Sequence, residues 1–283
     1  MNRTNPLPDS HRTIHEAMNT TFAFRFRGVD ETTAAGMARE CIDRIDHIES
    51  MLSRFIDGSD VSRINHLKAG ETLYLSETCH QCLLRAIEAH AITGGLFDIT
   101  LGARIAHRKS GEEGPPPALT GQLVIHPDTP AVTCVEAGRE IDLGGIGKGF
   151  ALDHLKQFLT EWGAEDFLLA AGASSLLAHG PTAWPIELAG NIESARIDLR
   201  DQSLSASGIT IQGSHIIHPG GPDAMPAAPC DRLWVTAATA TLAEIWSTAL
   251  MLLPVADIPA FLANDPDVTG VHADMQDRVE RIR

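Results

Sequence analysis

A glycine-rich segment, residues 141–150, has the residue types needed to bind an anion. It has the sequence Ile-Asp-Leu-Gly-Gly-Ile-Gly-Lys-Gly-Phe, which predicts a strand, a tight turn and a helix start in immediate succession. Unpaired amides and the helix dipole would then face an anion over the turn. A Walker A loop needs Ser or Thr after the lysine, and a dinucleotide fingerprint needs another glycine spacing. Taken alone, the segment is equally well explained as a tight turn with glycines at positive φ and a surface lysine.

A second candidate site lies on an apolar helix predicted over about residues 241–253, which Pro254 ends. Glu244 would be buried in this helix, which is costly unless the carboxylate has a partner. Thr248 projects from the same face, and a carboxylate and a hydroxyl at this spacing can together bind a hard cation such as Mg²⁺. Magnesium takes its remaining ligands from phosphate and water, which suits a nucleotide site. A Glu244 that pairs with a backbone group or an arginine explains the pattern equally well.

The charge distribution argues against a nucleic-acid partner and against an anionic-membrane surface. The 283 residues include 22 Lys plus Arg and 37 Asp plus Glu, which give a formal net charge of −15. The basic residues are scattered, whereas a polyanion partner requires a basic patch or stripe. An acidic protein can still bind a nucleotide if backbone amides, a metal ion and a few placed cations neutralise the phosphates.

The N-terminal segment and the cysteines predict a cytoplasmic protein without disulfides. The first 22 residues contain no apolar run long enough for a signal peptide or a membrane helix, so we expect no membrane segment. The five cysteines are odd in number and irregularly spaced, which does not suggest a disulfide framework. Cys79 and Cys82 could form half of a zinc or redox site. Their helical pattern, without a second Cys-x-x-Cys pair, favours a buried helix face.

The hydrophobic periodicity predicts an α+β fold, and we expect a single domain over residues 1–283. A strand pattern at about 14–26 precedes a helical pattern that ends at Leu52, and a second helix over about 76–93 ends at Gly94 and Gly95. The later elements are an extended segment at 96–100, a solvated loop or linker at 109–117, an amphipathic helix from 150 to 162, and strands at about 123–125, 131–135, 139–143, 167–170, 195–199, 215–217 and 233–237. This mixture is typical of an α+β protein rather than a regular βαβ array.

Several segments occur in an order that resembles the ApbE family of FAD:protein FMN transferases along nearly the whole chain. Residues 142–149 match the family's Asp-Leu-Gly-Gly-Ile-Ala-Lys-Gly with one change, Gly147. The helix with Glu244 and Thr248 is similar to the family's magnesium helix. The other similar segments are Met18-Asn19-Thr20, Ser53-Arg54-Phe55, residues 59–65, residues 95–102, Ser205-Ala206-Ser207-Gly208 and His215-Ile216-Ile217. The combination is far more specific than any one motif.

The resemblance implies a T-fold-related, mixed α/β architecture with the nucleotide site between two sub-structures. It implies that magnesium is held by the Gly145 carbonyl, Glu244 and Thr248. The residues that would line the FAD are Met18, Phe55, Leu96, Phe97, Asp98, Asp142, Lys148 and the backbone near Ile217.

The implied chemistry is a transfer of FMN from FAD to a Thr or Ser hydroxyl of an acceptor protein, with release of AMP. His215 would be the base that accepts the hydroxyl proton. Magnesium and Lys148 would neutralise charge on the pyrophosphate. The alternative for His215 is a strand histidine bonded to a carbonyl.

The sequence departs from the family pattern at several of these positions. His218 replaces the family's aspartate, Gly220 and Gly221 replace its Arg-Thr, and Glu244 is one methylene longer than the usual aspartate. These changes bear on catalytic competence and acceptor choice more than on the fold. A protein that binds or hydrolyses FAD without transfer is therefore the alternative function, and the sequence does not identify the acceptor.

Overall fold

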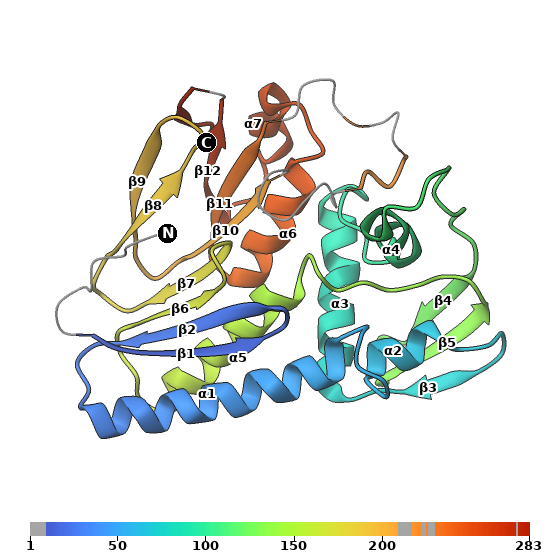
Figure 1. The fold of residues 1–283 in the computed structure, drawn as a ribbon, viewed down its shortest axis with the longest axis horizontal. Coiled ribbons are helices and arrows are strands. Elements are labelled where there is room, and N and C mark those ends of the chain that lie inside the picture. Colours follow the sequence, from blue (N-terminus) through green and yellow to red (C-terminus); the bar gives the residue numbers. More distant parts are fainter. Residues whose placement is uncertain (1–9, 209–216, 222–224, 226–229, 276) are drawn as a thin grey trace.

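The chain opens with a β-hairpin that forms one edge of a large antiparallel sheet (Figure 1). The computed structural model describes residues 10–208, 217–221, 225, 230–275 and 277–283. In the spatial order β1-β2-β6-β7-β10-β11-β12-β13, the strands are His11–Ala17, Thr20–Phe26, Phe167–Ala171, Ser175–His179, Ser203–Gly208, Arg232–Ala237, Val268–Asp274 and Val279–Arg281. Neighbours such as β2 and β6 are far apart in the sequence, so this sheet is built largely from long-range pairings.

The hairpin corrects the prediction of one strand over residues 14–26. Ala17 pairs with Thr20, which leaves Met18 and Asn19 as a two-residue loop with φ values of 50° and 56°. Positive φ at both loop positions is the geometry of a type I′ turn, which matches the twist of the flanking strands. Asn tolerates this conformation better than most residues, and it stands here without the Asn-Gly pair that usually signals such a turn.

Three helices cover one face of the large sheet, and a separate hairpin packs on its other face. The helices are α1 (Glu31–Leu52), α5 (Gly147–Glu161) and α6 (Ala240–Leu250). Phe22, Phe24 and Leu155 belong to the apolar cluster under α1 and α5, and each is fully buried. The hairpin consists of β8 (Trp184–Ala189) and β9 (Ser194–Leu199), and its Trp184 packs with Trp234 of the sheet.

A smaller sub-structure lies beside the large sheet (Figure 1). It comprises α2 (Asp60–Asn65), β3 (Thr72–Tyr74), α3 (Glu77–Ile92), α4 (Gly102–Ser110), β4 (Gln122–Ile125) and β5 (Ala131–Glu136), the three strands forming a sheet in the order β3-β5-β4. One apolar cluster contains Leu83 of α3 and Trp246 of α6, so the two parts share a core. A 3₁₀ turn (Val255–Asp257) and α7 (Ile258–Phe261) follow α6.

The four predicted helices are confirmed and correspond to α1, α3, α5 and α6. The α+β class is also confirmed. The prediction for residues 96–100 was wrong, because these residues form bends and turns held by the Thr93 hydroxyl, which accepts the Phe97 amide at 3.0 Å. Residues 139–143 were also expected to form a strand. They contribute a single parallel bridge, between Glu140 and Leu101.

Two further predictions concern the segments around α3 and α4. Lys109 and Ser110, expected in a loop, are the last residues of α4, and the loop begins at Gly111. Cys79 and Cys82 are buried in α3 as expected, and burial raises the pKa of both thiols well above the ordinary value. All five cysteines are buried free thiols. Across the described residues, helices are too short or too polar to cross a membrane.

Candidate nucleotide site

Two adjoining hollows lie where the small sub-structure meets the large sheet. The first, of about 160 Å³, is lined by residues 96–99 and 101, two residues of α4, the end of β10 and Thr248 of α6. The second, of about 530 Å³, is lined by the hairpin loop at Met18, the residues that end and follow α1, and the start of α5. Lys109, Asp142 and Gly144 line both hollows, so these residues mark the boundary between them.

The glycine turn between residues 142 and 147 shapes this boundary. Asp142 Oδ1 accepts the Gly144 amide at 2.8 Å, and a Cβ added to Gly144 would lie 2.9 Å from the same oxygen. A Cβ on Gly145 would lie 3.1 Å from the ring of Phe97. A side chain at either position would occupy the space in which Asp142 Oδ1 and the Phe97 ring pack against the turn. The glycines therefore allow a tight turn against the Asp142 carboxylate and the Phe97 ring.

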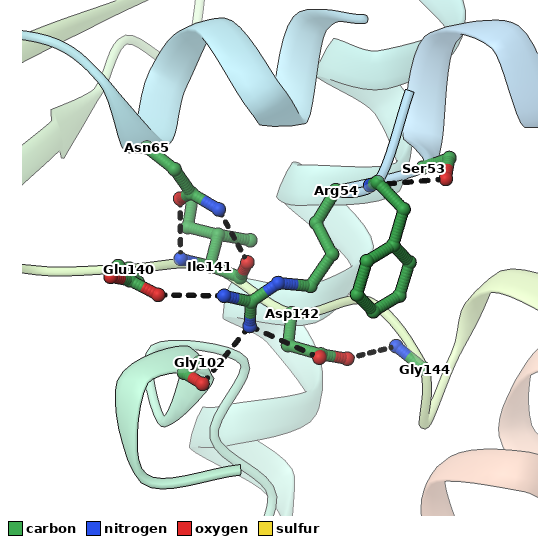
Figure 2. Close-up of polar contacts among 9 residues, drawn as sticks. Ser53, Arg54, Asn65, Gly102, Glu140, Ile141, Asp142 and Gly144 are labelled. Carbon is green, nitrogen blue, oxygen red and sulfur yellow. Dashed lines mark hydrogen bonds and ion pairs between the residues drawn. The ribbon is translucent and has the colours of Figure 1, made fainter. Parts of the chain in front are cut away.

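Arg54 binds the two carboxylates that lie next to the turn, those of Glu140 and Asp142 (Figure 2). Its NH2 group donates to Glu140 Oε2 at 2.6 Å, and its NH1 group donates to the Gly102 carbonyl at 3.0 Å and to Asp142 Oδ2 at 3.3 Å. The guanidinium side chain is only 14 % exposed. Both carboxylate oxygens of Asp142 therefore have donors, one from Arg54 and one from Gly144. Charge-assisted contacts of this kind hold a side chain in one orientation.

Asn65 holds the backbone one residue earlier, as Figure 2 shows. Its amide side chain accepts the Ile141 N–H at 2.7 Å and donates to the Ile141 carbonyl at 2.9 Å. The amide of Asp142 donates to the Ile99 carbonyl at 2.8 Å. The extended segment around Ile141 belongs to no sheet, so its backbone N–H and C=O groups need other hydrogen-bond partners. The contacts with Asn65 and Ile99 supply those partners. The segment that carries Asp142 is thus tied to α2 and to residues 99–102.

Glu244 lies behind the turn and has two protein partners. Its side chain is 5 % exposed, and its Oε1 forms an ion pair with Lys148. Its Oε2 accepts the amide of Gly149 at 2.6 Å. The alternative to a metal ligand was a Glu244 paired with a backbone group or an arginine. The backbone partner is as expected, and the cationic partner is a lysine instead of an arginine. A buried carboxylate needs such compensation, so the pair accounts for how Glu244 is accommodated in an apolar helix.

The residues predicted to hold magnesium supply the hard oxygen donors that this ion prefers. Gly145 and Thr248 line the same hollow, and a Cβ on Gly145 would lie 3.7 Å from Thr248 Oγ1. Glu244, one turn earlier on α6, already attracts a cation, the Lys148 ammonium. The described part of the chain has no group of three or more His, Cys, Asp or Glu side chains that could hold a metal. The predicted ligands are one carboxylate, one hydroxyl and one carbonyl, and these donor types fit magnesium. The assignment of Gly145, Glu244 and Thr248 as magnesium ligands stays a prediction.

The structure brings most of the predicted site residues to the two hollows. The residues that line one or both are Met18, Phe55, Leu96, Phe97, Asp98, Asp142, Gly145, Lys148, Ile217 and Thr248. Glu244 lines neither hollow, because it faces Lys148 and Gly149. The predicted base, His215, lies outside the described residues.

Sequence reasoning assigned no role to two cations at this site. Arg54 belongs to the Ser53-Arg54-Phe55 motif, and an arginine between a small residue and an aromatic residue carries no signal for its distant carboxylate partners. Lys109 was assigned to a solvated loop because Gly, Glu and Pro residues follow it. Ile105 is the only large apolar residue of α4, so hydrophobic periodicity gave no signal for a helix that reaches Lys109.

Comparisons with known proteins agree with this fold and site. The profile of the ApbE family matches residues 18–272. The FAD:protein FMN transferase of Klebsiella pneumoniae strain 342 is 24 % identical over 277 residues, which cover 84 % of this chain and 77 % of that protein. The protein of the same name from Escherichia coli K12 is 22 % identical over 270 residues, with the same coverage of 84 % and 77 %.

Solved structures share the fold. The ApbE protein of Thermotoga maritima superposes with a TM-score of 0.81 at 20 % identity, covering 96 % of this chain and 97 % of that one. The flavin transferase ApbE from Vibrio cholerae gives a TM-score of 0.79 at 20 % identity, covering 96 % of both chains. The expected ApbE-like architecture is therefore confirmed. Because the family profile spans most of the sequence, the chain belongs to the ApbE family.

Proposed function

We propose that this protein transfers FMN from FAD to a Thr or Ser hydroxyl of an acceptor protein and releases AMP. The observation that carries the proposal is the pair of adjoining hollows with a shared boundary at Asp142 and Gly144. A dinucleotide has two ring systems joined by a pyrophosphate, and it matches two hollows joined at one turn. The relatives named FAD:protein FMN transferase support the choice of FAD over other dinucleotides.

The residues of the hollows divide the binding task. Phe55 and Phe97 offer apolar rings, and Phe55 is 79 % exposed at its hollow, where a ligand could cover it. Met18 and Leu96 extend the apolar lining, one in each hollow. Asp98 and Asp142 offer carboxylates that accept hydrogen bonds. Aromatic and apolar walls with a few placed polar groups are typical of cofactor sites.

The proposed reaction is a displacement at phosphorus. The hydroxyl oxygen of the acceptor forms a bond to the FMN phosphorus, and the bond from that phosphorus to the bridging oxygen breaks, so the AMP keeps the bridging oxygen. The hydroxyl proton passes to the imidazole of His215, a group suited to proton transfer near neutral pH. Gly145, Glu244 and Thr248 would hold magnesium, which supplies positive charge to the phosphates when bound. Positioning and charge stabilisation are the main sources of rate in such transfers.

The alternative function is binding or hydrolysis of FAD without transfer. We retain this alternative because the sequence departs from the family pattern at His218. His218, which replaces the family's aspartate, accepts the Gly220 amide at its Nδ1 at 3.0 Å. The imidazole therefore stabilises a local turn at a position where the family has a carboxylate. Loss of that carboxylate bears on the chemical step more directly than on the two hollows.

Incubation of the purified protein with FAD and magnesium distinguishes these functions. A transferase releases AMP only when an acceptor protein is added, and the flavin becomes covalently bound to that acceptor. A hydrolase releases AMP with water as the nucleophile, so it needs no acceptor. A binding protein releases none. Chromatography of the nucleotides, with flavin fluorescence on a denaturing gel, measures both products. AMP release that is independent of acceptor, or absent with it, would contradict the transferase proposal.

A further inference from the structure

Lys109 stands at the boundary between the two hollows. It lies in the last turn of α4, which ends at Gly111 with a φ of 71°. Lys109 shares with Asp142 and Gly144 the property of lining both hollows. A ligand that occupies both hollows must therefore pass beside Lys109. Because α4 belongs to the small sub-structure and the glycine turn leads into α5, the boundary is formed from opposite sides of the site.

Of the described residues that line the hollows, the two other cations are already paired with carboxylates. Arg54 contacts Glu140 at 2.6 Å and Asp142 at 3.3 Å, and Lys148 is paired with Glu244. The side chains of Arg54 and Lys148 are 14 % and 15 % exposed. Lys109 is exposed, and it forms no ion pair with any residue that the structure describes.

The site as a whole is rich in negative charge. Glu49, Asp98 and Asp142 line the hollows, and Glu140 and Glu244 stand behind them as the partners of Arg54 and Lys148. Among the described residues at the site, these carboxylates outnumber the three cations Arg54, Lys109 and Lys148. A doubly charged pyrophosphate would be repelled here unless cations neutralise it. An ammonium with three donors and a flexible stem is well suited to phosphate oxygens.

We infer that Lys109 binds the pyrophosphate of FAD, as the cation that crosses from the small sub-structure to the glycine turn. The inference rests on the proposed function, since it assumes that FAD spans both hollows. It adds a phosphate-binding residue to Lys148, whose ammonium is shared with Glu244. It also gives α4 a functional role, because the helix carries the charge to the boundary.

The test compares Lys109→Ala, Lys109→Arg and Lys68→Ala by calorimetric titration with FAD and with riboflavin, in the presence of magnesium at low and high salt. Lys68→Ala is the matched control, because it removes one exposed lysine that lines neither hollow. Lys109→Ala should raise the Kd for FAD about tenfold or more, the effect of losing one charge-assisted contact. Its Kd for riboflavin, which has no phosphate, should not change. The salt dependence of FAD binding should become weaker.

Lys109→Arg and Lys68→Ala should both bind FAD like the parent. The inference is overturned if Lys109→Ala binds FAD with the parent's affinity, or if it loses FAD and riboflavin equally, which would indicate a structural role. A parent protein that does not bind FAD would overturn the proposed function and this inference together. A parent that binds FAD while Lys109→Ala binds it equally well would leave the proposed function standing and refute only the role of Lys109.

Discussion

Glu244 shows what a buried charge requires of its surroundings. Its sequence context allowed a magnesium ligand or a structural carboxylate, and the structure gives it Lys148 and the Gly149 amide as partners. The two roles are compatible, because a carboxylate has more acceptor positions than these two contacts use. Its identity as Glu rather than Asp is consistent with the reach from α6 to the start of α5.

Glu244→Gln should lower the stability of the ligand-free protein. Glutamine can still accept the Gly149 amide, but it leaves the Lys148 ammonium without a counter-charge. We expect a loss of roughly 3 kcal/mol in the free energy of unfolding, at the low end for a broken buried pair because Lys148 is partly exposed. Glu140→Gln is the control, since its carboxylate is 36 % exposed and its removal should cost less. Chemical denaturation measures both.

The same variant also reports on the metal. If Glu244 holds magnesium as proposed, adding magnesium to the FAD-bound protein should raise the thermal midpoint of the parent further, and it should give no such increment in Glu244→Gln. A variant as stable as the parent would contradict the structural importance of the ion pair. A variant that still gains stability from magnesium would contradict the assignment of Glu244 as a ligand.

The close approach of α5 and α6 positions Lys148 and Glu244 behind the glycine turn. Asp153 of α5 accepts the amides of Ala240 and Thr241 at 2.8 Å each, so it caps the start of α6. Gly149 lies against the Ala240 carbonyl, where an added Cβ would collide with the backbone. This contact brings the Gly149 amide within reach of Glu244. The family's glycine after the lysine thus has a packing explanation here.

Two glycine substitutions in α5 should have opposite effects. Gly147→Ala should raise the free energy of unfolding by up to about 1 kcal/mol, because Ala favours the helix and a Cβ there meets no atom within 4 Å. Gly149→Ala should lower it by roughly 1–3 kcal/mol, because the methyl group forces α5 away from α6. Urea unfolding of the two variants gives the comparison. Equal effects of the two substitutions would show that α5 and α6 separate without penalty.

The sequence predicted long elements better than short ones. The periodic apolar positions of α1, such as Ile45 and Ile48, predicted that helix and its end at Leu52. The turn at Met18 and Asn19 contains no glycine or proline, so the first hairpin was taken as one strand. The short and polar helix α4 was missed because only Gly102 of its nine residues is buried. Periodicity gives no signal where an element has no apolar face.

The residues of the site could be predicted from the sequence, but their arrangement in space could not. The resemblance to the ApbE family named ten residues that line the hollows, from Met18 to Thr248. Periodicity and composition could not show that these segments lie close together in the fold. Strand β6 pairs with β2, which is far away in the sequence, and with β7, while α6 follows β11 in the other half of the same sheet. The Arg54 and Lys148 pairings depend on those long-range contacts. They were therefore visible only in the folded chain.

A crystal structure of the protein with FAD and magnesium would show where the dinucleotide lies. The two hollows share a boundary at Lys109, Asp142 and Gly144, so we expect the pyrophosphate to lie at this boundary. The isoalloxazine and adenine rings should then occupy different hollows, with the Phe97 ring in one and the Phe55 ring in the other. FAD held entirely in one hollow, or bound at another surface of the molecule, would contradict the proposal that FAD spans both hollows.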